Sequence, residues 1–495
     1  MTSVSVSRWA DGAPATSDEQ ASLPSGLRTG VLEEVLSPPE GGSKGFSYGI
    51  DPQVLLASGI LRNPAIPEQA LERAKSLCAQ ARYREARAAL VPHVNNAESA
   101  LDAQLRGVLA ECSLHGGGAE PAVAIADALE RFEDRGEVEP AAQMRVLLAE
   151  LQLQTGDFSS AKDNLCHARR IFRDTACPRQ SARVGALLAR LTLLSGDSHA
   201  ALETVEGAAQ EAALGTLAAA MNRLERARIH AYRNDPNRVA RDLVEAERIL
   251  RSRMSLALRL QPRIVRAETL NILGYRSRAL RGLRKLLIDV VTLEDTHVRA
   301  RVHLLLGNAA IDEDATFARR YLMRARHLYE TFGGEYGAAE ADIGLVRVEQ
   351  RLGLNPRPRL RALESRDLSE WSLLASRLAI AKAEIFAGSR PAVIRRGLLE
   401  ARERAAKHGL RAVMAEIDNT LRRHGLIEDH GIELTPVEKR RKAREPRCRH
   451  QPLPVAFTEA NPESPINRVP LERPAVGAAL VGMPRNDTGA EKQTA

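Results

Sequence analysis

The stretch that decides the fold runs from Leu147 to Phe172 and reads LLAELQLQTGDFSSAKDNLCHARRIF. Its apolar residues recur at the three- and four-residue spacing of an amphipathic helix, and Gly156-Asp157 interrupts that spacing once. Glycine supplies the left-handed conformation that commonly ends a helix, and aspartate can cap the N-terminus of the helix that follows. The stretch therefore predicts a helical hairpin. The small residues that we expect where helix axes approach closely are Ala149, Ala161 and Ala168.

The same pattern repeats along the chain. The next unit reads LLARLTLLSGDSHAALETVEGAA, with Gly196-Asp197 at its turn. The alanines at the matching position of successive second helices are Ala86, Ala124, Ala161, Ala201, Ala240, Ala279 and Ala318, spaced by 38, 37, 40, 39, 39 and 39 residues. Because an isolated hairpin of this length cannot bury its apolar stripe, the units are expected to stack on one another. With two degraded units near Gly353 and Gly388, the sequence predicts about nine hairpins.

Composition supports the same class of fold. Aromatic residues make up 3 % of the 495 residues, and alanine and leucine dominate, which suits close packing of helices. We therefore expect an all-α protein, an α-solenoid or superhelix of about nine stacked helical hairpins with disordered N- and C-terminal segments. The predicted boundaries are a disordered leader over 1–50, the repeat solenoid over 51–427, and a basic, then Pro-rich, disordered tail over 428–495.

The turn Gly-Asp-Phe, with Ala161 five residues after the glycine and Ala168 seven further on, resembles the tetratricopeptide repeat. The period is longer than the usual 34 residues of that family. Repeats near 40 residues are similar to the arrays of bacterial transcriptional regulators of the maltose-activator type. The resemblance covers about residues 67–426 and implies a protein-interaction scaffold or regulatory sensor, in bacterial transcriptional or signalling control.

The resemblance also implies that the first helix of each hairpin lines a concave groove. Taken in the register of the small first-helix residue, the groove positions are Arg183, Arg190, Arg228, Glu268, Arg301 and Asn308. Mixed charge at one position per repeat suits an extended peptide or a partner helix, whose carboxylates arginine can bind. The alternative interpretation of each of these residues is an ordinary solvated position on a helix.

Motifs of enzymes and metal sites are missing from the sequence. It contains no GxxxxGK[ST], no HExxH and no GxSxG, and no GxGxxG follows a predicted strand. The five cysteines form no CxxC pair, so we expect free thiols and a cytoplasmic location. No apolar run reaches about 18 residues, so no membrane span is predicted. The sequence predicts no enzyme, no cofactor and no metal site, and it leaves the oligomeric state open.

A basic run offers an alternative function. Between Glu438 and His450 lie seven basic and two acidic residues, a local charge of +5, which can bind phosphate backbones. The candidate nucleic-acid contacts are Lys439, Arg440, Arg441, Lys442, Arg444 and Arg447. The preceding Leu434-Thr435-Pro436 is similar to the opening of the helix-turn-helix domain of maltose-activator regulators. The apolar residues of its later helices are absent, so a complete DNA-reading domain is not predicted. A solvated basic linker is the other interpretation.

Overall fold

The computed structural model describes residues 66–95, 99–117, 120–252 and 255–426. Within these ranges the chain forms nineteen α-helices and no strand. The first helices of successive hairpins are α3 (Pro67–Ala79), α5 (Ser99–Gly116), α7 (Val138–Thr155), α9 (Pro178–Leu194), α11 (Leu217–Tyr232), α13 (Leu256–Ile272), α15 (Thr296–Ala310), α17 (Glu335–Arg351) and α19 (Ser372–Phe386). The second helices are α4 (Tyr83–Leu90), α6 (Pro121–Asp134), α8 (Phe158–Asp174), α10 (Ser198–Glu211), α12 (Pro236–Leu250), α14 (Arg276–Val291), α16 (Ala315–Thr331), α18 (Arg357–Glu364) and α20 (Pro391–Lys407).

A short 3₁₀ turn (Val91–His93) follows α4, and a single helix, α21 (Arg411–Arg423), follows the last hairpin. The all-α class and the nine hairpins confirm the sequence prediction for the described part of the chain. The predicted leader over 1–50, the residues 51–65 and the predicted tail over 428–495 lie outside the described residues. No helix in the described ranges is long and apolar enough to cross a membrane. The four described cysteines are free thiols, as expected.

The predicted turn chemistry is present in the structure. Gly156 and Gly196 end first helices with φ of +94° and +99°, a region that glycine adopts without a steric penalty. The carboxylates of Asp157 and Asp197 then accept hydrogen bonds from backbone N–H groups in the first turn of the following helix, at 3.0 Å. The same cap recurs at Asp314, which accepts from the N–H of Phe317 at 2.9 Å. One Gly-Asp pair thus ends one helix and begins the next.

Most of the predicted anchor alanines pack at the seams between helices. Those no more than 4 % exposed are Ala86, Ala161, Ala201, Ala240, Ala279 and Ala318. Ala124 departs from the prediction because it is only half-buried. In α6 the buried residues are Ile125, Ala128 and Phe132, so the apolar stripe of this helix is shifted by one residue from the anchor position.

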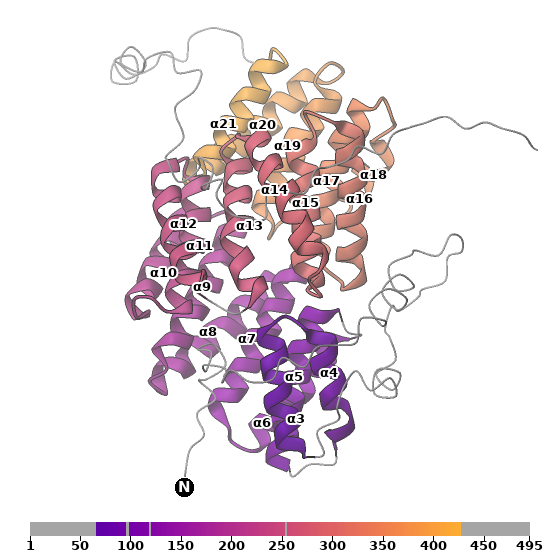
Figure 1. The fold of residues 1–495 in the computed structure, drawn as a ribbon. Coiled ribbons are helices and arrows are strands. Elements are labelled where there is room, and N and C mark those ends of the chain that lie inside the picture. Colours follow the sequence, from indigo (N-terminus) through magenta and orange to yellow (C-terminus); the bar gives the residue numbers. More distant parts are fainter. Residues whose placement is uncertain (1–65, 96–98, 118–119, 253–254, 427–495) are drawn as a thin grey trace, which may run out of the picture.

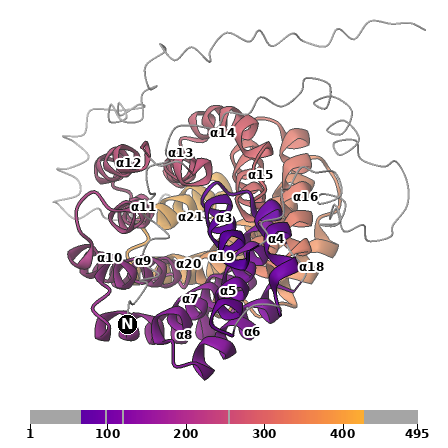
Figure 2. The same ribbon diagram turned by 60° about the horizontal axis from the view of Figure 1, so that its bottom comes forward.

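The helices form two layers. First helices contact one another from repeat to repeat, as α9 does with α11 and α11 with α13, whereas second helices contact the helices next to them in sequence. Figure 2 shows α8, α10, α12, α14 and α16 around the outside of the molecule, with first helices on the inner side. The first helices therefore provide the inner wall of the superhelix.

Successive turns of the superhelix touch. Helix α7 contacts α17, α5 contacts α15, and α11 contacts α21, although these helices are far apart in sequence (Figure 1). At one such contact the indole N–H of Trp371 donates a hydrogen bond of 2.8 Å to the carbonyl of Gly156, 215 residues away. At another, the Ser198 hydroxyl donates to the carbonyl of His408 at 2.7 Å. The sequence analysis did not predict this closure, which covers part of the inner wall.

The contact between turns can be tested at Gly156. A Cβ added there would overlap the indole ring of Trp371, whereas a Cβ at Gly274, also at the end of a first helix with positive φ, would meet open space. We expect Gly274→Ala to cost about 1–2 kcal/mol of unfolding free energy from backbone strain. Gly156→Ala should cost about 1–3 kcal/mol more, because overpacking adds to that strain. Urea unfolding followed by circular dichroism measures both; equal losses would show that Trp371 does not pack against this turn.

Candidate functional site: a charged ladder on the inner wall

The predicted groove residues Arg228, Glu268 and Arg301 lie together on the inner wall. The Nε of Arg228 on α11 lies 3.1 Å from a carboxylate oxygen of Glu268 on α13. Arg301 on α15 binds the other oxygen of Glu268 at 2.6 Å and also binds Glu340 on α17 at 2.9 Å. Each of these pairs joins first helices of neighbouring repeats. The inner wall is therefore held together by ionic contacts as well as by apolar packing.

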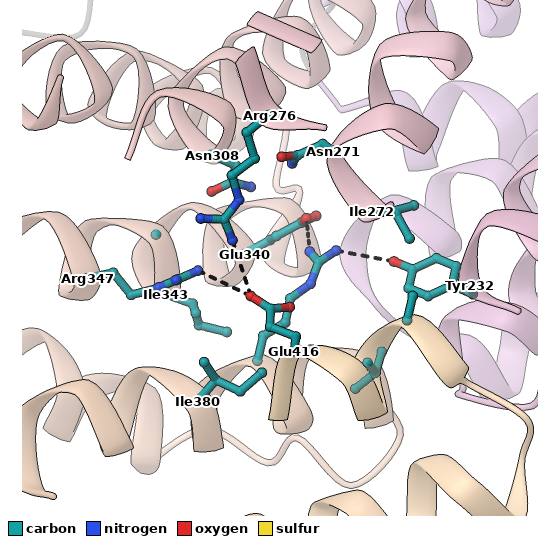
Figure 3. Close-up of a pocket in the computed structure, with 14 residues that line it drawn as sticks. Tyr232, Asn271, Ile272, Arg276, Asn308, Glu340, Ile343, Arg347, Ile380 and Glu416 are labelled. Atoms are coloured by element: carbon teal, nitrogen blue, oxygen red, sulfur yellow. Dashed lines mark hydrogen bonds and ion pairs between the residues drawn. The ribbon is translucent and has the colours of Figure 1, made fainter. Parts of the chain in front are cut away.

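Further pairs extend this row in both directions. Arg228 also pairs with Glu225 on its own helix, and Arg377 on α19 pairs with Glu340. Arg377 then donates a hydrogen bond of 3.2 Å to the hydroxyl of Tyr232. Figure 3 labels Tyr232 and Glu340 in this region. We call the row of alternating acids and bases the inner ladder; its members are Glu225, Arg228, Glu268, Arg301, Glu340 and Arg377. Three carboxylates face three guanidinium groups, so the inner ladder has no net formal charge.

Because the carboxylates of the inner ladder are buried, the charge of each is stabilised by the arginines that it contacts. Burial alone would raise the pKa of Glu268, but the charges of Arg301 and Arg228 outweigh it and hold that pKa well below its ordinary value. For Glu340 the balance is the same, with Arg301 and Arg377 lowering the pKa against the effect of burial. Both carboxylates are less than a tenth exposed. Removing one partner from such a buried network leaves the other charge uncompensated.

The other three predicted groove residues have different surroundings. Arg183 is exposed and pairs with Glu150 on α7 at 3.1 Å. Asn308 is half-buried and lines a small pocket. Arg190 on α9 is half-buried, and within the described residues it has no ion pair or hydrogen bond. Burial and the like charge of Arg228 lower the pKa of Arg190, although the charges of Glu225 and Glu268 act in the opposite direction. It is thus an inner-wall cation whose positive charge is not matched by a bound carboxylate.

The pocket lies where α13, α15, α17, α19 and α21 meet and has a volume of about 80 Å³ (Figure 3). Glu416 of α21 projects into it, with its carboxylate 3.4 Å from Arg276 and 3.8 Å from Arg347. Arg347 is in turn held by both oxygens of Glu384, at 2.8 and 3.0 Å. The last helix of the described chain therefore supplies a carboxylate to the inner wall.

Besides Glu225 on α11, the sequence analysis missed four inner-wall residues of later repeats, namely Glu340, Arg347, Arg377 and Glu384. They continue the register of the predicted groove residues, because Glu340 follows Arg301 by 39 residues and Arg347 follows Asn308 by 39. They lie in the units whose turns have lost the Gly-Asp pattern. Extending the register through those units would have found them.

The chemistry available on this wall is ionic recognition. The inner ladder presents guanidinium groups that bind carboxylates, and a group of three or more His, Cys, Asp or Glu side chains able to hold a metal does not occur in the described ranges. The basic residues predicted to contact nucleic acid, Lys439 to Arg447, lie outside the described residues. That prediction stays untested by the structure.

No protein-family model matches the chain, and no curated protein matches it. Among solved structures the chain is similar to a Rap protein complexed with competence and sporulation factor, at 14 % identity and a TM-score of 0.37. It is also similar to the TPR domain of P58(IPK), at 14 % identity and a TM-score of 0.21. Both matches cover 72 % of this chain and 98 % of the other. The description of this chain as a solenoid of helical hairpins rests on its own helices.

The inner ladder should contribute measurably to stability. Glu268→Gln removes a carboxylate that two arginines share, so we expect a loss of about 3 kcal/mol in unfolding free energy. The matched control is Glu400→Gln, because Glu400 is exposed on α20, and surface changes of this kind stay within about 0.5 kcal/mol. Urea unfolding compares the two. Similar, small losses in both variants would show that the inner ladder is solvated and weak.

The lowered pKa values of Glu268 and Glu340 also predict a pH dependence. The stability that these carboxylates provide is fully present above their ordinary pKa, about 4.3, and is lost as the pH falls toward their lowered folded-state values. The urea midpoint of the native chain should therefore fall as the pH is taken from neutral to about 3. In Glu268→Gln/Glu340→Gln the fall should be smaller. An unchanged pH profile in this double variant would contradict the assignment.

Proposed function

We propose that this chain is a non-catalytic, cytoplasmic protein-interaction scaffold or regulatory sensor in bacterial transcriptional or signalling control, and that it binds a carboxylate-bearing peptide or partner helix on its inner wall. The observation that carries the proposal is Arg190. This inner-wall arginine is half-buried, and no carboxylate in the described ranges pairs with it.

The surroundings of Arg190 favour an anionic ligand. Burial lowers the pKa of His297 on α15, and the charge of Arg190 lowers it further. The same charge opposes the raised pKa of Tyr329 near the end of α16. The guanidinium of Arg190 therefore lies near elements from another part of the superhelix. The neighbouring arginines Arg228 and Arg301 are already engaged in the neutral inner ladder. A carboxylate from a partner would complete the pairing at Arg190 and offset the cost of holding it away from water.

This arrangement also suggests how binding could be sensed. Arg190 lies on α9, which begins the hairpin whose second helix carries Ser198, and Ser198 bonds to His408 in another turn of the superhelix. A ligand segment inserted beside Arg190 would compete with the contacts that hold the turns together. Binding would then change the spacing of the turns, and a second partner could detect that change.

A single substitution separates a ligand-binding arginine from a structural one. Arg190→Gln should raise the unfolding free energy of the free chain by about 1 kcal/mol, because burial and Arg228 disfavour this charge more than Glu225 and Glu268 favour it. The same variant should fail to retain the protein that the native chain captures from its own cell extract. The two readouts are the urea midpoint and the amount of co-purified protein, each measured against Arg396→Gln on the exposed face of α20.

An Arg190→Gln variant that loses stability and still retains the partner would rule out the binding role. Retention of the partner by every variant would show that the partner does not bind at the inner wall. If the native chain instead retains nucleic acid that washes off with moderate salt, the alternative function predicted from the basic run 438–450 would replace the scaffold.

A further inference from the structure

Two neighbouring outer helices, α14 and α16, carry a cationic surface that the sequence analysis did not single out. Helix α14 has five basic residues and one acidic residue, and α16 has four arginines and one acidic residue. These two helices together have a formal charge of +7, against +8 for the whole chain. The exposed arginines are Arg278, Arg281 and Arg284 on α14 and Arg319, Arg320 and Arg324 on α16. We call this surface the basic outer face.

A cation–π contact joins the two helices. The guanidinium of Arg284 lies over the ring of Phe317, 5.2 Å from its centroid, in a cation–π contact. Phe317 packs against Tyr321 with the ring centroids 4.4 Å apart, and Tyr321 packs against His303 of α15 at 5.5 Å. The rings of α16 thus pack on each other and on α15, and Arg284 links α14 to this group, which we call the aromatic seam. The basic outer face is therefore one surface shared by two repeats.

Acidic side chains near this surface are bound elsewhere. Asp289 pairs with Arg263 and Glu330 with Arg326, and neither of these partners is among the six arginines. Glu313 accepts a hydrogen bond from Ser277, and Glu294 accepts one from a backbone N–H of α4. Within the described residues, no ion pair or side-chain hydrogen bond engages Arg278, Arg281, Arg319, Arg320 or Arg324. The charge of the basic outer face is thus left uncompensated by the protein.

Neighbouring groups respond to this concentration of positive charge. Burial and the charges of Arg324 and Arg84 lower the pKa of Arg299 on α15. Burial, with Arg324 and Arg299, lowers the pKa of His303 to about 4. His303 therefore stays neutral at physiological pH and adds packing to the surface without adding charge. Like charges held this close repel one another, which a bound polyanion would relieve.

We propose that the basic outer face, formed by the exposed arginines of α14 and α16, binds the phosphate backbone of a nucleic acid. This binding is independent of the inner wall and of the partner proposed for it. Along α14 the three arginines recur every three residues, and at 1.5 Å per residue they form a stripe about 9 Å long. Arg320 and Arg324 form a second stripe on α16. Two parallel stripes of guanidinium groups suit a phosphate chain, because each can bind a phosphate with two donors.

The chemistry of the surface favours nucleic acid over an acidic protein helix. A protein helix would need apolar contacts among the charges. The exposed apolar residues of α14, Ile288 and Val291, lie beyond the arginine stripe, toward the end of the helix. On α16 the one exposed large apolar side chain among the arginines is Met323, which is too little for a helix interface. The aromatic rings are stacked on one another and on Arg284, so their faces are not free to stack bases. Recognition through phosphates alone is expected to be independent of sequence and strongly dependent on salt.

The test measures binding of the full chain to a fluorescein-labelled duplex DNA and to a labelled single-stranded RNA by fluorescence anisotropy across a salt titration. About five phosphate contacts predict a slope of log affinity against log salt of about −4.5 for the duplex. The variant Arg278→Gln/Arg281→Gln/Arg320→Gln/Arg324→Gln removes exposed groups only. It should bind at least tenfold more weakly at low salt and with a visibly shallower slope.

Two further variants make the result specific. Arg390→Gln/Arg395→Gln/Arg396→Gln/Arg404→Gln removes the same charge from exposed positions on α20 and at its N-cap, and it should bind like the native chain. Lys439→Gln/Arg440→Gln/Arg441→Gln/Lys442→Gln removes four of the seven charges of the basic run. The proposal is overturned if only this variant loses binding, if all three variants lose it equally, or if the native chain binds neither probe. Hydrogen exchange of the native chain gives a second readout, in which DNA should protect the segment 278–324.

Discussion

Every repeat of this protein depends on its neighbours for burial. A hairpin of two helices has an apolar stripe on each helix but too little surface to enclose both, so the stripe is covered only when the next hairpin stacks on it. The small residues set how closely this stacking occurs. Ala149, Ala161 and Ala189 are fully buried where helices meet, and Gly307 packs so closely against α16 that a Cβ would overlap Leu322. This requirement fixes the period and divides the helices into an inner and an outer layer.

The two layers use the same residue type for different purposes. On the inner wall, arginines are enclosed by first helices of several repeats, and buried guanidinium groups need carboxylates. The inner ladder meets that need, and Arg190 is left without a partner beside it. On the outer layer, α14 and α16 expose arginines to solvent, where pairing is not required and the charges accumulate. We infer a carboxylate partner for the first environment and a phosphate backbone for the second.

Contacts between turns add a constraint that no single repeat contains. Trp371 fills the space above Gly156, and Glu416 reaches Arg276 and Arg347 across the inner wall. Such contacts join residues from distant repeats, so they restrict the superhelix as a whole. A partner that binds the inner wall has to fit between these turns or separate them. The same contacts that stabilise the closed superhelix therefore link occupancy of the wall to its shape.

The sequence by itself determined the local structure and the repeat. Gly156-Asp157 specifies the end of one helix and the start of the next because left-handed backbone and N-cap hydrogen bonds are local interactions. The register of Arg228, Glu268 and Arg301 could also be read from the sequence, because stacked repeats place equivalent positions on one wall.

Only the tertiary structure decided which charges meet. Sequence analysis could not show that Arg301 pairs with both Glu268 and Glu340, that Arg190 is left alone, or that Trp371 packs on Gly156. The arginines of α14 and α16 look like ordinary solvated positions until the stacking of the repeats places the two helices on one face, with Arg284 over Phe317. The physical reason is that the pitch of the superhelix results from small rotations summed over many repeats. Contacts across turns, and the electrostatic field of a whole face, therefore depend on how all the repeats are arranged together.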